Sequence, residues 1–269
     1  MSINKLVIGL IFGGESSEHK VSIKSARNIF AALNTSNNKK YFFTIPIYID
    51  ESGFWCDYES SKSILLEKGK KQIDYAKNEK LSNRLINLPI FNEKIDIWFP
   101  ALHGPNGEDG VIQGLFKLTG KPFVGSGILG SSLGMDKIAM KSIFETFNLP
   151  QAPYIYLEKK NIKNTNYTDS IIKNINYKIN YPCFIKPANL GSSIGITKAF
   201  SERELLNGIN QAALFDERII IEKNINGREL ECAILGKSIM SASVIGEVKF
   251  KSDWYNYETK YSEGQSNII

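Results

Sequence analysis

The chain has 269 residues, of which 42% are hydrophobic and 11% aromatic, enough for the core of one large domain or two ordinary ones. The 33 lysine and arginine residues outnumber the 28 aspartate and glutamate residues, and they are scattered rather than gathered with aromatic residues. This distribution argues against a nucleic-acid-binding surface and is typical of a soluble globular protein that can bind a small anion.

The cysteines and the apolar runs bear on the compartment. Cys56, Cys183 and Cys232 are far apart and form no CxxC pair, so neither a disulfide framework nor a zinc site is indicated. The apolar run at 6–12 is too short to cross a bilayer and lacks a cleavage site. The sequence therefore predicts a cytoplasmic protein with no membrane partner.

The first half alternates between strand and helix patterns. Two of its strands end in glycine-rich loops, one at Gly13 and one that begins at His103. Such alternation predicts an open, mainly parallel α/β sheet, whose ligands lie beyond the carboxyl ends of the strands. The expected elements are strands at 5–14, 41–50 and 95–102 and helices at 17–33 and 111–118.

The pattern changes near residue 135, where we place a domain boundary. The second half indicates an α+β arrangement with an antiparallel sheet, and the segment 254–264 has no period and is expected to be a long loop. The expected elements are helices at 135–148 and 201–215, a helical insertion before residue 180, and strands at 154–157, around 182–186, 218–222, 229–235 and 239–245.

The stretch FIKPANLGSSIGIT, residues 184–197, permits two interpretations. Glycine and serine between strand-like runs are ordinary hairpin chemistry. However, Lys186 lies on an apolar strand, where an ammonium is costly unless an anion meets it. Ser192, Ser193 and the flanking glycines could supply hydroxyl and backbone N–H donors to a phosphate, although the spacing is not that of a Walker loop. Both a hairpin and a phosphate-binding loop remain open from these residues.

Six motifs, in this order, resemble those of the D-alanine–D-alanine ligases of the ATP-grasp superfamily. The resemblance extends from residue 5 to the last residue. The motifs are GGESSEHKVS at 13–22, LHGPNGEDGVIQG at 102–114, VGSGILGSSLGMDK at 124–137, IKPANLGSSIGI at 185–196, IEK at 221–223 with Glu229, and YETKY at 257–261.

The resemblance implies both a fold and a reaction. The fold would be ATP-grasp, with an N-terminal open parallel α/β domain at 1–135, a central α+β domain with an antiparallel sheet at 136–238, and a truncated C-terminal domain at 239–269. The reaction would join two D-alanine molecules through an acyl phosphate made from ATP, for peptidoglycan synthesis. The resemblance also implies a homodimer that forms through the first domain.

The resemblance also implies roles for residues on the nucleotide side. Lys137 and Lys186 would hold the α- and β-phosphates, and the loop from Gly191 to Gly195, with Ser192 and Ser193, would cover them. Lys260 would reach the γ-phosphate when its loop closes. The adenine pocket and the ribose hydroxyls would be met by Glu222, Lys223, Ile225 and Glu229. The sequence alone favours a solvated lysine in a first helical turn for Lys137. Glu229 could be a surface acid, and only its seven-residue distance from Glu222 favours a contact with the nucleotide.

On the D-alanine side, the resemblance places Glu18 near the ammonium of the first D-alanine, in a hydrogen-bonded set with Ser192 and Tyr261. His103 would lie beside the substrate carboxylate. An acid in a first helical turn and a histidine in a loop are also expected on structural grounds alone. His19 has no role by resemblance and is predicted to lie at the surface.

The sequence departs from the family at its end. The family has an RxD strand and a Glu-x-Asn segment that bind two Mg²⁺ ions, and neither occurs before Ile269. A fragment of a longer enzyme, a truncated gene product and a non-catalytic nucleotide-binding remnant are therefore open alternatives. A D-alanine–D-lactate ligase is disfavoured by Tyr261, and another ATP-grasp carboxylate–amine ligase by the first two motifs.

Overall fold

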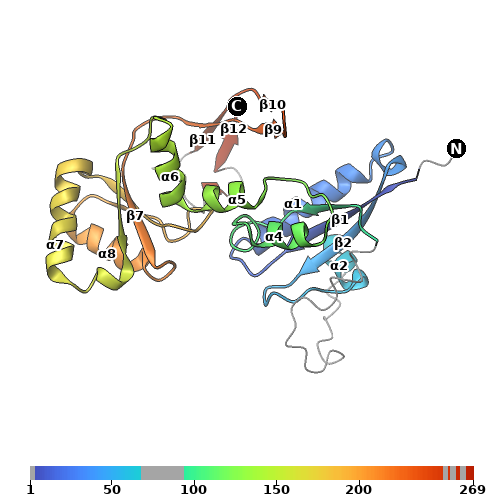
Figure 1. Ribbon diagram of the computed structural model, residues 1–269, viewed down its shortest axis with the longest axis horizontal. Helices are drawn as coiled ribbons and strands as arrows, with labels where there is room; N and C mark the ends of the chain where they lie inside the picture. The colour runs from blue at the N-terminus through green and yellow to red at the C-terminus, as the bar shows by residue number, and fades with distance from the viewer. Residues whose placement is uncertain (1–3, 68–93, 251–253, 255–258, 261–264) are drawn as a thin grey trace. The chain divides into compact units, whose positions relative to one another are not determined.

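A computed structural model of the chain describes residues 4–67, 94–250, 254, 259–260 and 265–269. The chain divides into two compact units, Met1–Asp136 and Lys137–Ile269 (Figure 1). Each unit has its own sheet and core, and each is described separately below. Among the described residues, no helix is both long and apolar enough to span a membrane.

The first unit contains a three-stranded parallel sheet, as the alternating pattern predicted. Strand β1 (Leu6–Gly13) lies between β2 (Phe42–Ile49) and β3 (Ile97–Pro100), with Ile11 opposite both Ile47 and Pro100. Because all three strands run the same way, their carboxyl ends meet at one edge of the sheet. The two glycine-rich loops begin at this edge.

Helices cover both faces of this sheet (Figure 1). Leu10 and Phe12 of β1 share a buried cluster with residues of α1 (His19–Leu33) and α2 (Tyr58–Leu65). Ile11 points to the opposite face, where it packs with Ile112 and Phe116 of α4 (Val111–Leu118). Successive side chains on a strand point to opposite faces, so one buried strand contributes to two cores. A 3₁₀ turn at Asn38–Lys40, helix α2 and helix α5 (Ile128–Met135) were not predicted.

The second unit is built on a four-stranded antiparallel sheet in the order β4-β7-β5-β6, which confirms the predicted α+β arrangement. The helices α7 (Thr165–Asn174) and α8 (Glu202–Ala212), with a π turn at Ile175–Ile179, cover one face of it. Their apolar side chains form the larger core of this unit. The strands are β4 (Tyr154–Glu158), β5 (Cys183–Pro187), β6 (Thr197–Ala199) and β7 (Arg218–Lys223).

The opposite face of this sheet is more polar and is covered in part by α6 (Lys137–Thr146). Ile138 of α6 packs against Ile220 of β7 and Ala188, with Tyr154 at the edge of the cluster. The backbone N–H of Lys137 donates to the carbonyl of Ala188 at 3.0 Å, which ties the start of α6 to the segment that follows β5.

The strands expected at 229–235 and 239–245 are shorter and differently paired. Strand β8 (Glu229–Glu231) pairs with β11 (Gly246–Phe250), which also pairs with β12 (Ser266–Ile268). Strand β9 (Ile234–Gly236) instead pairs with β10 (Met240–Ala242) in a separate hairpin. The prediction of one continuous strand at 229–235 is therefore wrong, because its two halves have different partners.

Candidate functional site

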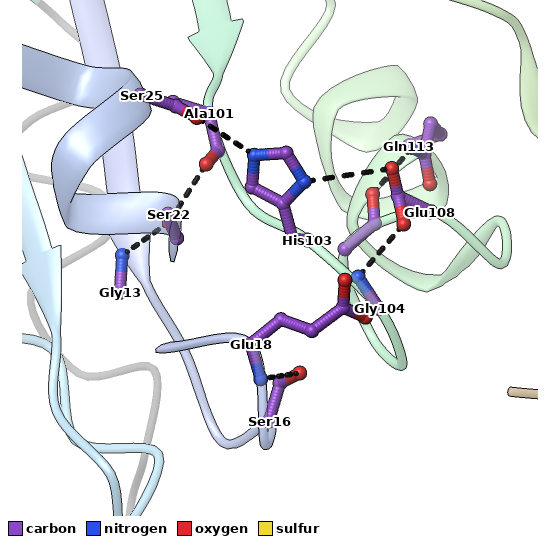
Figure 2. Close-up of polar contacts among 11 residues, drawn as sticks. Gly13, Ser16, Glu18, Ser22, Ser25, Ala101, His103, Gly104, Glu108 and Gln113 are labelled. Atoms are coloured by element: carbon purple, nitrogen blue, oxygen red, sulfur yellow. Dashed lines mark hydrogen bonds and ion pairs between the residues drawn. The ribbon is translucent and has the colours of Figure 1, made fainter. Parts of the chain in front are cut away.

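Hydrogen bonds through one buried serine join the strand ends of the first unit. Gly13 and Gly14 end β1 with φ of +90° and +95°, a backbone region that favours glycine. The hydroxyl of Ser22, on α1, accepts a hydrogen bond from Gly13 N at 2.8 Å and donates to the carbonyl of Ala101 at 2.7 Å (Figure 2). The carboxyl ends of β1 and β3 are therefore fixed to the same turn of α1.

Glu18 lies directly before α1 and is 3% exposed. Its side chain does not cap the helix. Its carboxylate instead lies against Gly104, as Figure 2 shows, and a Cβ at Gly104 would come within 2.5 Å of Glu18 Oε2. Gly104 has φ of +73°, so both the backbone conformation and the carboxylate favour glycine at this position. Helix electrostatics alone therefore do not account for the position of Glu18.

His103 is held by contacts on two sides (Figure 2). Its Nε2 lies 2.9 Å from the hydroxyl of Ser25 on α1, and its Nδ1 lies 4.0 Å from Glu108 Oε1. Glu108 Oε2 also accepts a hydrogen bond from Gly104 N at 2.8 Å, which closes the loop on itself. The His103 side chain remains 30% exposed, so a ligand can reach the ring.

A cavity of about 500 Å³ opens beside these loops within the first unit. Gly14, Glu15, His103 and Asn106 are among the residues that line it and contribute polar groups. Its other walls are mainly apolar and include Ile49, Trp55, Leu102, Ile112, Leu115 and Leu118. A concave, mainly apolar pocket with a few polar groups is the usual form of a small-molecule site.

His19 is buried at 5% exposure, so the prediction that it lies at the surface is wrong. Its Nδ1 lies 2.7 Å from the carbonyl of Gly14, and its Nε2 lies 2.9 Å from the hydroxyl of Tyr48. A carbonyl can only accept, so Nδ1 carries a proton, and in the neutral ring Nε2 accepts from Tyr48. The ring therefore links the glycine turn at Gly14 to Tyr48 of β2, which lies 29 residues further along the chain. No local pattern indicates this contact.

The polar face of the second unit contains a cluster of three charges, of which Glu222 and Lys141 are buried and Lys186 is half-buried. Lys186 of β5 lies 2.5 Å from Glu222 Oε2 of β7, and Lys141 of α6 lies 3.3 Å from Glu222 Oε1. Burial by itself would raise the pKa of Glu222, but the two ammonium groups hold the pKa below its usual range. The anion expected to meet Lys186 is thus present in the chain itself.

The stretch 184–197 is a hairpin, because Ile185 of β5 pairs with Thr197 of β6. Its loop also has an unusual backbone, since Ser192, Ser193 and Gly195 have φ of +49°, +61° and +69°. Positive φ at these positions bends the backbone sharply, and turns of this kind can form anion-binding nests from successive N–H groups. The hairpin interpretation is confirmed, and phosphate binding by the same loop stays a prediction.

Two contacts fix this loop at its ends. The ammonium of Lys137 donates to the carbonyl of Leu190 at 2.5 Å. At the other end, a Cβ on Gly195 would lie 2.7 Å from the ring of Phe215 and 2.8 Å from Pro187. Lys137 and the loop are therefore adjacent within the second unit, as a common role in binding phosphate requires.

The remaining expected site residues of this unit are more exposed. Lys223, Ile225 and Glu229 are exposed at the end of β7 and on β8, and Lys260 is half-buried beside the buried Thr259. Tyr261 lies outside the described residues, and Ser192 and Glu18 belong to different units. The hydrogen-bonded set expected of these three residues therefore stays a prediction.

Two lysines of this face were missed by the sequence analysis. Lys141 follows Lys137 by one helical turn, and Lys198 lies over the rings of Phe184 and Phe200 at 5.6 and 5.3 Å. Helical spacing could have indicated Lys141, since residues four apart share a helix face.

Metal ions in proteins are commonly held by several His, Cys, Asp or Glu side chains. Within 4–67, 94–250 and the short described segments after them, no three or more His, Cys, Asp or Glu side chains are grouped so that they could hold a metal ion. These residues therefore do not form a metal site of that kind by themselves.

Comparison with known proteins identifies the family. The model of the D-ala D-ala ligase N-terminus matches residues 7–126, and that of the D-ala D-ala ligase C-terminus matches residues 143–269. A D-alanine–D-alanine ligase from Prochlorococcus marinus (strain NATL1A) is 61% identical over 269 residues, which are 100% of this chain and 76% of the relative. The chain belongs to the D-alanine–D-alanine ligase family.

Other members of this family agree in sequence and in fold. A D-alanine–D-alanine ligase from Synechococcus sp. (strain CC9311) is 46% identical over 97% of this chain and 74% of its own length. Among solved structures, the VanG D-Ala:D-Ser ligase from Enterococcus faecalis is 33% identical with a TM-score of 0.75, covering 99% of this chain and 76% of that one. D-alanyl-alanine synthetase A from Vibrio cholerae is 26% identical with a TM-score of 0.75, covering 100% and 74%. The ATP-grasp fold expected from the motifs is confirmed.

Proposed function

We propose that this chain catalyses the ATP-dependent ligation of two D-alanine molecules to D-alanyl-D-alanine, a building block of peptidoglycan. The observation that carries the proposal is the 61% identity, over the whole of this chain, to a D-alanine–D-alanine ligase. The charged cluster at Glu222 and the left-handed loop after β5 support it, because they offer cationic groups and N–H donors to a nucleotide.

The proposed reaction has two steps. The γ-phosphate of ATP moves to a carboxylate oxygen of the first D-alanine, which gives an acyl phosphate and leaves ADP. The amine of the second D-alanine then attacks the carbonyl carbon, so a C–N bond forms while phosphate leaves. Because a carboxylate must approach an anionic phosphate, positive charge has to be placed around the transferring group in advance.

Residues of the second unit would supply that charge. Lys186 and Lys137 would contact the α- and β-phosphates, and the loop with Ser192 and Ser193 would close over them. Lys260 would approach the γ-phosphate, and closure of its segment would exclude water that could otherwise hydrolyse the acyl phosphate. The adenosine would be met by Glu222, Lys223, Ile225 and Glu229.

The family uses ATP together with Mg²⁺, which neutralises phosphate charge. The described residues supply no cluster of three metal-binding side chains. We therefore propose no magnesium ligand among the described residues.

Residues of the first unit would bind the amino acid. Glu18, buried against Gly104, would accept the ammonium of the first D-alanine, and His103 would lie beside its carboxylate. The hydrogen bond of His103 to Ser25 would hold the ring toward the cavity. Ser192 and Tyr261 would complete the hydrogen-bonded set around Glu18.

The identity of the second substrate separates the main proposal from its alternative. A structural relative at 33% identity is a D-Ala:D-Ser ligase, so D-serine is a specific candidate. The chain would be incubated with Mg-ATP, D-alanine and an equal concentration of D-alanine, D-serine or D-lactate. We expect D-alanine to support phosphate release without any other substrate, and D-alanyl-D-alanine to dominate the mass spectrum of each mixture. A dominant D-alanyl-D-serine or D-alanyl-D-lactate product would contradict the proposal.

A pair of variants tests the amino-acid side. Glu18→Gln should raise the KM for D-alanine about tenfold or more, because a charge-assisted hydrogen bond to an ammonium is lost. Glu59→Gln is the matched control, since Glu59 is an exposed acid in the first turn of α2 in the same unit. Equal effects of the two substitutions would show that Glu18 acts only through helix electrostatics.

We also propose a cytoplasmic homodimer. The support is the resemblance stated above and the use of ATP, which is a cytoplasmic substrate. Sedimentation equilibrium of the purified chain should give twice the mass of 30.2 kDa, and a monomer at all concentrations would contradict this part of the proposal.

A further inference from the structure

Lys141 is the most buried lysine in the described part of the chain and belongs to none of the motifs that identify the family. It lies in the second turn of α6, one turn after Lys137. Its side chain is 9% exposed, whereas that of Lys186 is 22% exposed. A buried ammonium is costly unless its charge is compensated, so this position calls for a physical reason.

The ammonium of Lys141 is compensated on three sides by its own unit. It lies 3.3 Å from Glu222 Oε1, donates to the carbonyl of Ala152 at 3.3 Å, and stands 5.1 Å from the centre of the Tyr154 ring. An ammonium has three N–H donors, and these contacts occupy them. Lys141 is therefore built to stay where it is rather than to turn toward a ligand.

Lys186 has a different environment. Its ammonium contacts Glu222 Oε2 at 2.5 Å and lies 5.7 Å from the centre of the Phe184 ring. In the described part of the structure it has no hydrogen-bond partner besides Glu222, so it keeps donors for a ligand. If Lys186 moves to a phosphate, Glu222 loses its shorter ion pair while it remains 8% exposed.

We infer that Lys141 is a positioning residue for nucleotide binding: it keeps the charge of Glu222 compensated, so that Lys186 can turn from Glu222 to a phosphate. Without Lys141, releasing Lys186 would leave a buried carboxylate with no counter-ion, which costs far more than an exposed one. Lys141 also holds the carboxylate from the Oε1 side, so Glu222 keeps its orientation when Lys186 leaves it. The inference rests on the proposed function, because it assigns a phosphate to Lys186.

The test is a double-mutant cycle read by the Kd of ATP, measured by isothermal titration calorimetry on the full chain. Lys141→Met removes the charge and keeps a long apolar side chain. We expect this substitution to weaken ATP binding about tenfold and to leave the KM for D-alanine unchanged. In a Glu222→Gln background the same substitution should have little effect on the Kd, because no carboxylate charge remains to be compensated.

Lys159→Met is the control for loss of an ion pair in the same unit, since Lys159 pairs with Glu217 at 3.0 Å and is 46% exposed. Lys159→Met should leave the Kd of ATP unchanged.

An unchanged Kd of ATP in Lys141→Met, or a tenfold loss that persists in the Glu222→Gln background, would overturn the inference. If Lys141→Met does not fold, the double variant is compared with Glu222→Gln alone. An equal Kd in that pair supports the inference, and an unfolded or weaker-binding double variant contradicts it.

The wild-type titration separates this inference from the proposed function. If the wild-type chain binds no ATP, the proposed function fails and the inference fails with it. If the wild-type chain and Lys141→Met bind ATP equally, only the inference fails.

Discussion

The contact between Gly104 and Glu18 allows a sharp test of the amino-acid site. Replacing Gly104 by alanine has two separable consequences. The residue has φ of +73°, and a non-glycine residue in this region costs about 1 to 2 kcal/mol of folding free energy. In addition, the new Cβ would lie 2.5 Å from Glu18 Oε2 and 2.7 Å from Ser16 Oγ.

The size of the second effect follows from the distance. Ordinary van der Waals contact begins at 3.4 Å, so the Glu18 carboxylate must withdraw by about 0.9 Å. Misplacing a substrate-binding group by about 1 Å can lower the rate by about 100-fold. We therefore expect Gly104→Ala to lower kcat/KM for D-alanine by about 10- to 100-fold, with the Kd of ATP unchanged.

The variant Gly120→Ala separates the effect of backbone strain from the effect of displacing the Glu18 carboxylate. Gly120 has φ of +72°, and no other side chain or distant backbone atom lies within 4 Å of the Cβ it would carry. Both variants should therefore lose about 1 to 2 kcal/mol, which corresponds to a drop in Tm of roughly 2 to 8 °C by calorimetry. Only Gly104→Ala should impair the use of D-alanine in the phosphate-release assay. An equal loss of kcat/KM in both variants would refute the placement of Glu18 in the amino-acid site.

Three further outcomes are expected. Lys186→Ala should abolish the protection that ATP gives against heat, because a phosphate contact is lost, and undiminished protection in a thermal shift assay would contradict the placement of the phosphate loop. Burial would raise the pKa of Asp57, but hydrogen bonds from two backbone amides and a serine of α2 lower the pKa overall. Its cap should therefore stabilise the chain by about 1 kcal/mol above pH 4 and lose this contribution as the pH falls through the lowered pKa, so urea unfolding of Asp57→Ala and wild type should converge in acid. Iodoacetamide at pH 8 should label the exposed Cys232 first, because burial raises the pKa of Cys56 to about 12 and that of Cys183 to about 11. The labelled residues are identified by mass spectrometry of peptides, and early labelling of either buried thiol would contradict this packing.

The sequence by itself determined the local elements and the family. Apolar periodicity located β1 and α4 closely, since the observed helix Val111–Leu118 has the predicted bounds. The bounds of these two elements depend on residues close together in the chain, so the periodicity of the sequence is enough to predict them. The order and spacing of six motifs identified the family before any geometry was known. They also indicated two loops at the ends of parallel strands, because parallel strands bring their carboxyl ends to one edge.

Other features depended on partners far along the chain. The periodic pattern at 229–235 could not show that its two halves pair with different strands. His19 was predicted to lie at the surface because it has no role by resemblance, but it is buried, and Tyr48 of β2 contacts its ring. Burial of a polar side chain depends on a hydrogen-bond partner, and that partner can come from any element that packs nearby.

Lys186 shows most clearly which features the sequence predicts and which need the tertiary structure. The sequence showed that an ammonium on an apolar strand needs an anion, which is a matter of desolvation energy. Only the tertiary structure showed that Glu222 is such an anion and that Lys141, from a helix on the same face, shares it. Charge compensation acts through space over a few ångströms, so it is decided by the packing of β5, β7 and α6 rather than by their spacing in the chain.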